Sequence, residues 1–326
     1  MKNILITGGA GYVGSKLVPL LLKNNYNVIV YDLMIYGSDV INEHPNLKMI
    51  KGDIRDINYL SEFIKVSECV IHLACISNDP SFELNPSLGK SINLDCFEPM
   101  LKSCVKNSIE RFIYASSSSV YGVKSDPEVH EELSLEPLTD YSKFKAECET
   151  ILSKYQSDKF TTITIRPATV CGYAPRQRLD VVVNILTNLA YHKNEITVLG
   201  GDQLRPNIHI DDMAEAYLTL LKADKNDVAG EIFNAGYENF SILDIAHMVK
   251  KNIGPKVNII KKISNDDRSY KISSSKIYKK LNFMPKKTIE DAVIDLVKAF
   301  QNGDLQNTLN SDKYFNIKRM QKIDLK

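Results

Sequence analysis

An apolar strand, a glycine-rich turn and the start of a helix follow one another in the stretch Lys2-Asn3-Ile4-Leu5-Ile6-Thr7-Gly8-Gly9-Ala10-Gly11-Tyr12-Val13-Gly14. Gly8 permits a tight turn, Gly11 lets the backbone approach a pyrophosphate, and Gly14 lets the helix pack closely on the strand. The N-terminus of the helix then faces the phosphates. The stretch predicts a dinucleotide site; the alternative is a turn that only joins a strand to a helix.

The next strand ends at an acidic residue that bears on the choice of dinucleotide. Residues 26–31 are mostly apolar and lead directly to Asp32. A carboxylate at this point accepts hydrogen bonds from ribose hydroxyls, whereas a 2′-phosphate would meet a like charge. Residues 33–47 contain no Arg or Lys to offset that charge. The sequence therefore favours NAD over NADP, unless Asp32 is an ordinary surface aspartate.

The composition narrows the class of protein. The 326 residues are 44% hydrophobic and 25% charged, which suits a soluble globular chain with one large domain and a smaller lobe. A net charge of +1 gives no electrostatic case for nucleic acid or membranes. The apolar run 17–22 is far shorter than the roughly 20 residues of a membrane span, and the early strand leaves no room for a signal peptide. We expect a cytoplasmic protein.

The six cysteines are scattered, with no Cys-x-x-Cys and no paired histidines. Neither a zinc site nor a disulfide framework is expected, and no metal is assigned. Free, buried thiols are the predicted state.

Strands and helices alternate through the first half of the chain. After Asp32 the expected strands are 48–51, 69–73, 111–115 and 161–165, and the expected helices are 57–64, 86–107 and 140–155. This alternation predicts an α/β fold with a doubly wound parallel Rossmann sheet, whose ligands lie beyond the carboxyl ends of the strands. We place an NAD-binding Rossmann domain at residues 1–166.

The pattern loosens into shorter pieces after residue 166. Helices are expected at 181–192, 211–221, 241–251 and 288–300, and strands at 196–199 and 232–234. We assign 167–326 mainly to a smaller C-terminal substrate-binding lobe, with some segments returning to the main sheet. The polar, mostly basic end 313–326 is expected to be a loosely held tail.

A tyrosine and a lysine four residues apart, Tyr141 and Lys145, share one face of a predicted helix. A nearby ammonium and a positive nicotinamide ring favour the phenolate, lowering the reference tyrosine pKa of about 10. The tyrosine can then accept a hydroxyl proton while a hydride leaves the same carbon. The same spacing occurs at Tyr12/Lys16, Tyr155/Lys159 and Tyr314/Lys318. Only the 141/145 pair follows a strand ending in hydroxyls, the run Ser116 to Ser119.

These features together resemble the extended short-chain dehydrogenase/reductase family, in its nucleotide-sugar epimerase and dehydratase branch, which includes UDP-glucose/galactose 4-epimerase-like enzymes. The resemblance covers nearly the whole chain. It rests on Thr7 to Gly14, Asp32, Gly52-Asp53-Ile54, His72-Leu73-Ala74, Asn93, the serine run with Val120-Tyr121-Gly122, Tyr141 to Lys145, Arg166-Pro167, Arg205 to Asp212, and Asp266 to Lys276.

The resemblance implies roles for individual residues. Tyr141 is the expected catalytic base and acid, Lys145 the group that binds the nicotinamide ribose and lowers the tyrosine pKa, and Ser117 the serine of the triad. The cofactor is expected to contact Gly8, Gly11, Tyr12, Val13, Gly14, Asp32, Asp53, Ile54, Leu73, Ala74, Asn93, Tyr141 and Lys145. The nucleotide sugar is expected to contact Ser118, Ser119, Thr169, Arg176, Arg178, Arg205 and Asp266.

Two of these assignments keep an alternative. Arg205 is expected to clamp the sugar-nucleotide pyrophosphate, because a guanidinium binds a diphosphate in bidentate fashion. The alternative is that Arg205 is a surface ion-pair residue. Arg176 and Arg178 either reach the substrate or are solvated. His209 is expected to support packing and backbone, not catalysis.

The reaction is narrowed by a departure from the family pattern. Dehydratases of this branch carry an Asp-Glu pair where this chain has Ser118 and Ser119, and hydroxyls alone do not supply the acid and base that water loss needs. NAD preference favours a cycle in which the cofactor is reduced and reoxidised in place, which is epimerisation, most simply at C4. The alternatives are a C4 oxidase or 4-keto reductase with the same triad and, more remotely, a non-catalytic dinucleotide-binding protein.

A homodimer is expected from the resemblance. The helices that form the family's interface carry apolar stripes here: Ile92, Cys96, Met100, Phe144, Cys148, Ile151 and Leu152. The alternative is that these stripes face the sheet as ordinary core.

Overall fold

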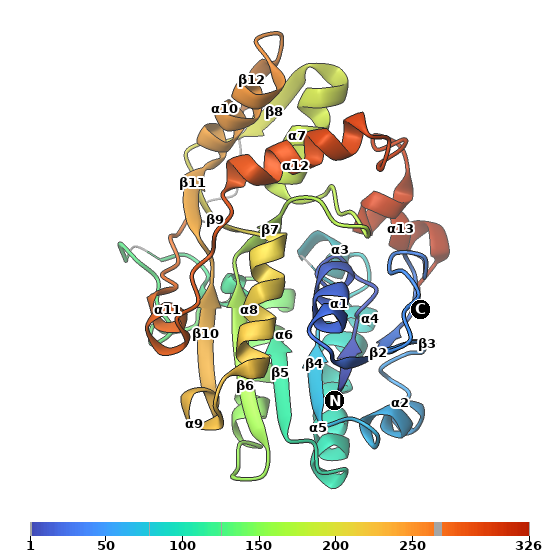
Figure 1. Ribbon diagram of the computed structural model, residues 1–326. Coiled ribbons are helices and arrows are strands. Elements are labelled where there is room, and N and C mark those ends of the chain that lie inside the picture. The colour runs from blue at the N-terminus through green and yellow to red at the C-terminus, as the bar shows by residue number, and fades with distance from the viewer. Residues whose placement is uncertain (1, 78, 125, 264–268, 326) are drawn as a thin grey trace.

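A parallel sheet of seven strands lies at the centre of the molecule, in the order β10-β6-β5-β4-β1-β2-β3 (Figure 1). The computed structural model describes residues 2–77, 79–124, 126–263 and 269–325. The strands are β1 (Asn3–Thr7), β2 (Asn27–Asp32), β3 (Leu47–Lys51), β4 (Cys69–His72), β5 (Arg111–Ala115), β6 (Thr161–Pro167) and β10 (Glu231–Ala235). The predicted doubly wound parallel sheet is confirmed.

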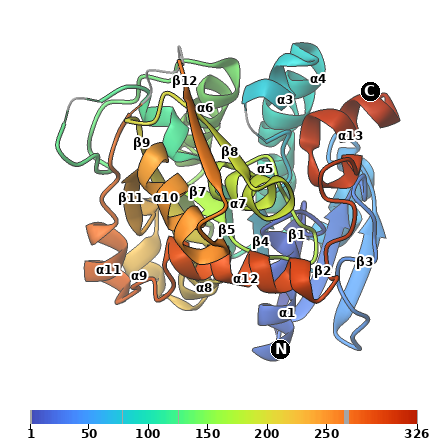
Figure 2. The ribbon, with the colours of Figure 1, turned by 90° about the horizontal axis from the view of Figure 1, so that it is seen from above.

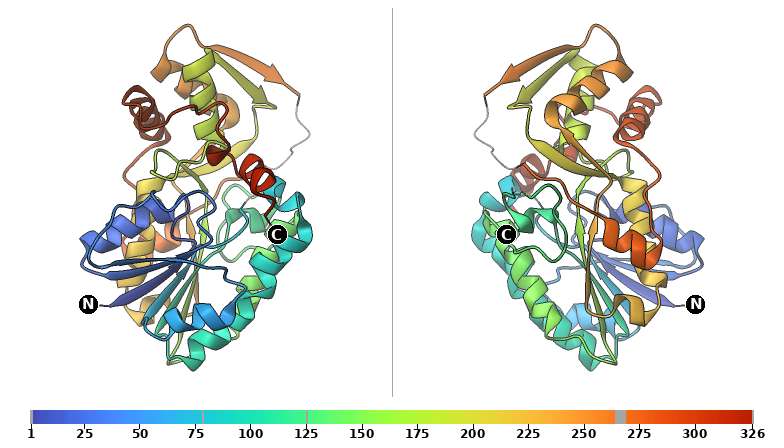
Figure 3. Two further views of the ribbon diagram at one scale, coloured as in Figure 1. Left: turned by 90° about the vertical axis from the view of Figure 1, so that its right-hand side faces the viewer. Right: turned by 90° about the vertical axis from the view of Figure 1, so that its left-hand side faces the viewer.

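Both faces of the sheet are covered because its strands are apolar on both sides. Ile4 and Ile6 of β1 pack in the cluster that contains the buried residues of α1 and α8, while Leu5 between them packs in the cluster of α2, α5 and α6. Figure 3 shows these two layers of helices on opposite sides of the strands. The helices are α1 (Gly14–Lys23), α2 (Ile57–Ile64), α5 (Phe97–Lys106), α6 (Asp140–Ser153) and α8 (Ile210–Lys222).

The helix predicted over 86–107 is not continuous. It is divided into α4 (Pro86–Lys90), the π-helical turn η1 (Ser91–Asp95) and α5. Within the wider turn, the Asn93 amide accepts from the Ile76 N–H (2.8 Å) and donates to the Ile76 carbonyl (3.0 Å). Periodicity does not reveal this break, because the apolar positions continue through it.

The second lobe is built on smaller sheets. One has the order β11-β9-β7 and the other pairs β12 with β8. Their strands are β7 (Thr169–Cys171), β8 (Glu195–Leu199), β9 (Leu204–His209), β11 (Glu238–Ser241) and β12 (Asn258–Lys262). The helices α7 (Val182–Lys193), α10 (Ile242–Ile253) and α12 (Ile289–Gln301) form a separate core with them. The chain returns to the main sheet in α8 and β10.

Four shorter helices complete the regular structure, together with two 3-10 turns. The helices are α3 (Asp79–Glu83), α9 (Lys225–Val228), α11 (Ser275–Leu281) and α13 (Asn316–Ile323), and the turns are η2 (Ser118–Tyr121) and η3 (Asp312–Tyr314). No helix in the described part of the chain is long and apolar enough to cross a membrane.

The end of the chain is folded, so the prediction of a loosely held tail over 313–326 is wrong for the described residues. Tyr314, Asn316 and Met320 are buried, and Met320 belongs to the core cluster of α2, α5 and α6. Figure 2 shows α13 beside α3. Most residues of α13 are polar or basic, so the sequence does not reveal the few buried positions that attach this helix.

The apolar stripes assigned to a dimer interface are core residues of the single chain. Ile92, Cys96, Met100, Cys148 and Leu152 are buried, and the stripe packs in one cluster beneath the sheet. The sheet-facing alternative therefore describes them, and they give no support to a dimer.

A buried ion pair supports the strand ends on which the serine run begins. Glu149 of α6 receives the Arg166 guanidinium (Nη2 to Oε2, 2.6 Å; Nε to Oε1, 3.0 Å) and the Ser116 hydroxyl, and both charged side chains are at most 5% exposed. Arg166 also donates to the Tyr121 hydroxyl at 2.7 Å. The pair therefore joins β6, α6 and the serine segment.

Removing one member of this pair should be costly. We expect Glu149→Ala to lower the free energy of unfolding by about 3–5 kcal/mol, because it leaves the Arg166 charge buried and uncompensated. Urea denaturation of the cofactor-free protein measures the loss. The control is Lys102→Ala, whose exposed pair with Glu98 (3.4 Å) should contribute less than about 1 kcal/mol. Equal effects of the two substitutions would contradict this interpretation.

Candidate active site

A cavity of about 460 Å³ lies above the carboxyl ends of the central strands. Residues from both lobes line it, as expected for a doubly wound sheet with a covering lobe. The predicted site residues in its wall are Gly8, Gly11, Tyr12, Val13, Gly14, Asp32, Ile54, Leu73, Ala74, Ser117, Ser118, Ser119, Tyr141, Lys145, Thr169, Arg176, Arg178 and Arg205. The cavity thus brings together residues that are up to about 200 positions apart in the sequence.

The glycine turn leaves no space for side chains at two positions. A Cβ at Gly8, where φ is +74°, would lie 2.5 Å from the Ala74 nitrogen, and a Cβ at Gly14 would lie 2.2 Å from the Gly9 carbonyl oxygen. Backbone atoms cannot move aside as side chains do, so both glycines are required. The turn packs closely against the end of β4 and leads into α1, which is the arrangement typical of a pyrophosphate site.

Asp32 holds this turn through one carboxylate oxygen and the loop after β2 through the other. The Ala10 N–H donates to Oδ2 (3.0 Å) and the Met34 N–H donates to Oδ1 (2.8 Å). Burial raises the pKa of Asp32, and the hydrogen bonds from Met34 and Ala10 oppose that rise. The carboxylate therefore has a structural duty in addition to its expected contact with ribose.

The capped start of α6 positions the predicted catalytic pair. The Thr139 hydroxyl oxygen accepts from the Ser142 N–H, and the Ser142 hydroxyl oxygen accepts from the Thr139 N–H. This capping box fixes the first turn of the helix. Lys145 Nζ donates to the Ala115 carbonyl at the end of β5 (2.6 Å) and lies 5.9 Å from the centre of the Tyr141 ring. Lys145 is thus tied to the strand end and faces the tyrosine ring.

The pKa of Tyr141 lies above its ordinary value, because the influences that raise it outweigh those that lower it. Burial raises it most, and the Cys75 thiol and the Asp79 carboxylate raise it further, while Arg178 and a hydrogen bond with Ser117 lower it. Lys145 and the nicotinamide ring are expected to lower this pKa, but in the structure burial outweighs the cations, and the cation that lowers the pKa is Arg178. Arg178, which comes from the second lobe, is a cation that sequence spacing does not connect with Tyr141.

The serine run forms a compact hydroxyl cluster. Ser117 caps η2, since its hydroxyl oxygen accepts from the Ser119 N–H (3.1 Å) and from the Ser119 hydroxyl (2.9 Å). The Ser118 hydroxyl lies 3.2 Å from that of Tyr270, which comes from the far part of the chain. The cluster offers hydroxyl groups to the cavity and no carboxylate.

Arg176 and Arg178 are inside the cavity wall, so the alternative that they are solvated is wrong. Arg176 is 4% exposed and stacks on the Tyr36 ring, its guanidinium carbon 3.6 Å from the ring centre. Arg178 pairs with Asp180 and donates to the Ser77 hydroxyl (3.3 Å). Arg205 also lines the cavity, from β9, and donates to its own neighbour's carbonyl at Leu204 (3.1 Å).

Two of the assigned residues that the structure describes, Asp53 and Asn93, are not in the wall. Asp53 turns to Arg55, with the Arg55 Nη2 2.6 Å from Oδ2, and Asn93 is used to hold the backbone of Ile76. Both thus support their neighbours Ile54 and Ile76, which do line the cavity. Asp266 lies outside the described residues.

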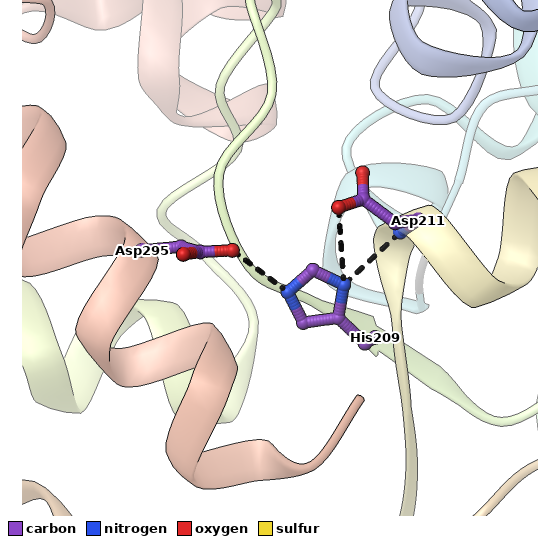
Figure 4. Close-up of side chains that lie close together, drawn as sticks. All are labelled: His209, Asp211 and Asp295. Atoms are coloured by element: carbon purple, nitrogen blue, oxygen red, sulfur yellow. Dashed lines mark hydrogen bonds and ion pairs between the residues drawn. The ribbon is translucent and has the colours of Figure 1, made fainter. Parts of the chain in front are cut away.

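His209 is outside the cavity wall and supports a helix. Its Nδ1 accepts from the Asp211 N–H (3.1 Å) as the N-cap of α8, and its Nε2 lies 3.4 Å from Asp295 Oδ2 (Figure 4). His209, Asp211 and Asp295 are the one group among the described residues with the spacing of a metal site. The Lys287 ammonium binds both carboxylates, at 2.8 and 3.0 Å, and so supplies the positive charge that a metal ion would supply.

Sequence reasoning missed several residues of the wall. Asp79 opens α3 and accepts from the Thr139 hydroxyl, and Tyr36, Ser77, Asn316, Met320 and Leu325 line the cavity from loops and from the end of the chain. No motif marks them. Their positions follow from tertiary contacts.

The residues present fit a dinucleotide. The turn at Gly8 and Gly14 is a cradle that a side chain would fill, and two nitrogens of the buried Arg176 guanidinium have no hydrogen-bond partner in the described structure. Such donors suit a phosphate oxygen.

Comparison with known proteins agrees with this site. The model described as the NAD dependent epimerase/dehydratase family matches residues 4–236. The dTDP-D-glucose 4,6-dehydratase of Bos taurus is 27% identical over 96% of this chain and 92% of its own length. The UDP-glucose 4-epimerase of Thermotoga maritima, solved with UDP-glucose, is 25% identical with a TM-score of 0.83, over 92% of this chain and 99% of that one. The UDP-glucuronic acid 4-epimerase from Bacillus cereus, solved with UDP-glucuronic acid and NAD, is 27% identical with a TM-score of 0.82 over the same shares.

Proposed function

The chain belongs to the NAD dependent epimerase/dehydratase family, and from that premise we propose that it is a nucleotide-sugar epimerase that inverts C4 through a 4-keto intermediate. The observation that carries the proposal is the wall around Tyr141. Ser117, Tyr141 and Lys145 share it, while positions 118 and 119 supply only hydroxyls. The site is thus equipped for proton and hydride exchange at one carbon.

The charge of the cavity favours two diphosphate ligands. Its described wall holds four cations, Lys145, Arg176, Arg178 and Arg205, against two carboxylates, Asp32 and Asp79. Both carboxylates already accept hydrogen bonds from the protein. The surplus of positive charge suits the pyrophosphate of NAD together with that of a nucleotide sugar.

Each residue of the triad has a distinct task in the cycle. When bound, NAD accepts the hydride from C4 and later returns it. Tyr141 takes the proton of the C4 hydroxyl, Ser117 holds the reacting oxygen by a hydrogen bond, and Lys145 adds positive charge beside the phenol. The 4-keto sugar then turns its other face toward the cofactor site, and Tyr141 returns the proton to the C4 oxygen. Electrons and protons balance, because the two half-reactions are each other's reverse.

Two alternatives keep the same triad. A C4 oxidase or a 4-keto reductase would stop after one half-reaction and exchange the cofactor. A 4,6-dehydratase is favoured by the relative from Bos taurus, but it needs an acid and a base beside the sugar ring, where this chain has Ser118 and Ser119. Asp79 accepts from Thr139 at the cap of α6 and serves to anchor that helix.

We also propose a cytoplasmic homodimer, on the strength of the resemblance to the family alone. The stripes on α5 and α6 are occupied as core and give this proposal no further support.

Substitution of the catalytic pair should abolish turnover. We expect Tyr141→Phe and Lys145→Met each to lower kcat at least about a hundredfold, because they remove the proton acceptor or its neighbouring charge. Coupled assay of sugar interconversion measures the loss, and circular dichroism checks the fold. Tyr155→Phe and Lys159→Met, with the same spacing outside the cavity, are the controls and should retain activity. Near-normal kcat in both 141 and 145 variants would sink the mechanism.

The product distinguishes the reactions. Incubation of the NAD-loaded protein with UDP-, GDP- and dTDP-hexoses and with UDP-glucuronic acid should convert at least one of them to a stereoisomer of unchanged mass. Liquid chromatography with mass spectrometry follows the product, and absorbance at 340 nm follows free NADH. A product lighter by one water would identify a dehydratase, and NADH in proportion to substrate would identify an oxidase.

A further inference from the structure

We propose that the C-terminal segment 312–325 is a wall of the cofactor site, in which Asn316 positions Arg176 toward the adenosine and pyrophosphate end of a bound dinucleotide and so slows its release. NAD binding is a property of the family, so the proposal does not need the epimerase reaction. It rests on the proposed function only for the reason that slow release is useful, since an epimerase reuses its bound cofactor. The segment comprises η3 and α13 and lies against α3 and the loop after β2 (Figures 1 and 2).

Asn316 joins three parts of the chain. Its Oδ1 accepts from the Tyr36 hydroxyl (2.9 Å) and from Arg176 Nη2 (2.7 Å), and its Nδ2 donates to the Ser77 hydroxyl (3.0 Å). Its backbone N–H donates to Asp180 Oδ2 (2.8 Å). The side chain is buried, lines the cavity, and meets residues of the Rossmann layer and of the second lobe at one point.

The Arg176 charge is the reason that this junction bears on a ligand. Its Nε and Nη1 have no hydrogen-bond partner in the described structure, and no carboxylate forms an ion pair with it there. The side chains that contact the guanidinium are Asn316, which accepts from Nη2, and Tyr36. A buried guanidinium in this state favours a bound anion. The Arg176 N–H donates to the Ser15 hydroxyl (3.3 Å) in the first turn of α1, the helix whose N-terminus faces the pyrophosphate site. The anion that suits this place is a dinucleotide phosphate.

Apolar residues of the same segment line the adjoining part of the cavity. Met320 is 7% exposed and packs in one cluster with Ile54, Ile76 and Ile92, and Leu325 packs against that cluster. All five line the cavity, and Ile54 follows β3 directly before α2, where an adenine contact is expected. An apolar wall of this kind suits the faces of a planar base. The segment thus offers both polar and apolar contacts to the cavity.

The segment is attached to the Rossmann layer by a small number of polar contacts. Arg319 Nε donates to the Ile35 carbonyl in the loop after β2. Within the segment, Asp312 receives Arg319 Nη1 (2.9 Å) and Lys322 Nζ (2.6 Å). The Arg319 contact and the buried Met320 attach α13 to the Rossmann layer without Asn316. A substitution at 316 should therefore change the ligand wall more than the fold.

The test measures cofactor release with no sugar present, so it stands apart from the proposed reaction. Protein loaded with NADH is mixed with a large excess of NAD, and the decay of bound NADH fluorescence gives the release rate. We expect Asn316→Ala to raise that rate at least about tenfold, because Arg176 loses the acceptor of its Nη2 and the wall loses the residue that joins its three parts. The control is Gln321→Ala, an exposed position on the same helix, which should release NADH at the parent's rate.

A second variant separates ligand recognition from a purely structural role. Asn316→Asp keeps an acceptor for Tyr36 and Arg176, but its carboxylate pairs with the guanidinium and competes with a phosphate. We expect faster release in Asn316→Asp as well, with an unfolding midpoint of the cofactor-free protein equal to or above the parent's. A parental release rate in Asn316→Asp would show that residue 316 acts only as a structural acceptor and would overturn the proposal. Rates within twofold of the parent in both variants would overturn it too.

Discussion

At the glycine turn, backbone segments lie so close together that no side chain fits between them. The candidate site depends on this close approach. The position of Gly8 beside Ala74 and of Gly14 beside Gly9 brings the N-terminus of α1 to the carboxyl ends of β1 and β4. Asp32 fixes the turn from the next strand through Ala10. The place of the pyrophosphate is set by these contacts, and the other walls of the cavity are built around it.

Positive charge reaches the cavity from segments that are distant in the sequence. The loop after β7 carries Arg176 and Arg178 into the cavity, one stacked on Tyr36 and the other near Tyr141. Their partners Asp180, Ser77 and Asn316 come from both lobes and from the end of the chain. Tyr141 and the end of the cavity near Tyr36 are therefore connected through one polar network that includes both arginines.

Local signals predicted the parts of the site that depend on local structure. The glycine turn, the strand end at Asp32 and the pair Tyr141/Lys145 each lie within one supersecondary unit, so spacing and polarity reveal them. The break at η1, the burial of Arg176 and the docking of α13 depend on contacts between distant segments, and a single sequence contains no pattern for them. Asp53 shows a third case: the motif is present, yet its carboxylate is taken by Arg55 two residues on.

The proposed cycle depends on one hydrogen that leaves C4 and returns to C4 while the cofactor stays bound. A nucleotide hexose labelled with deuterium at C4 tests this directly, when it is converted in the presence of excess unlabelled NADH and the product is examined by nuclear magnetic resonance. We predict that the epimer retains its deuterium at C4. Deuterium found in free NADH, at C6 of a dehydrated product, or diluted by the added NADH would contradict the proposed cycle.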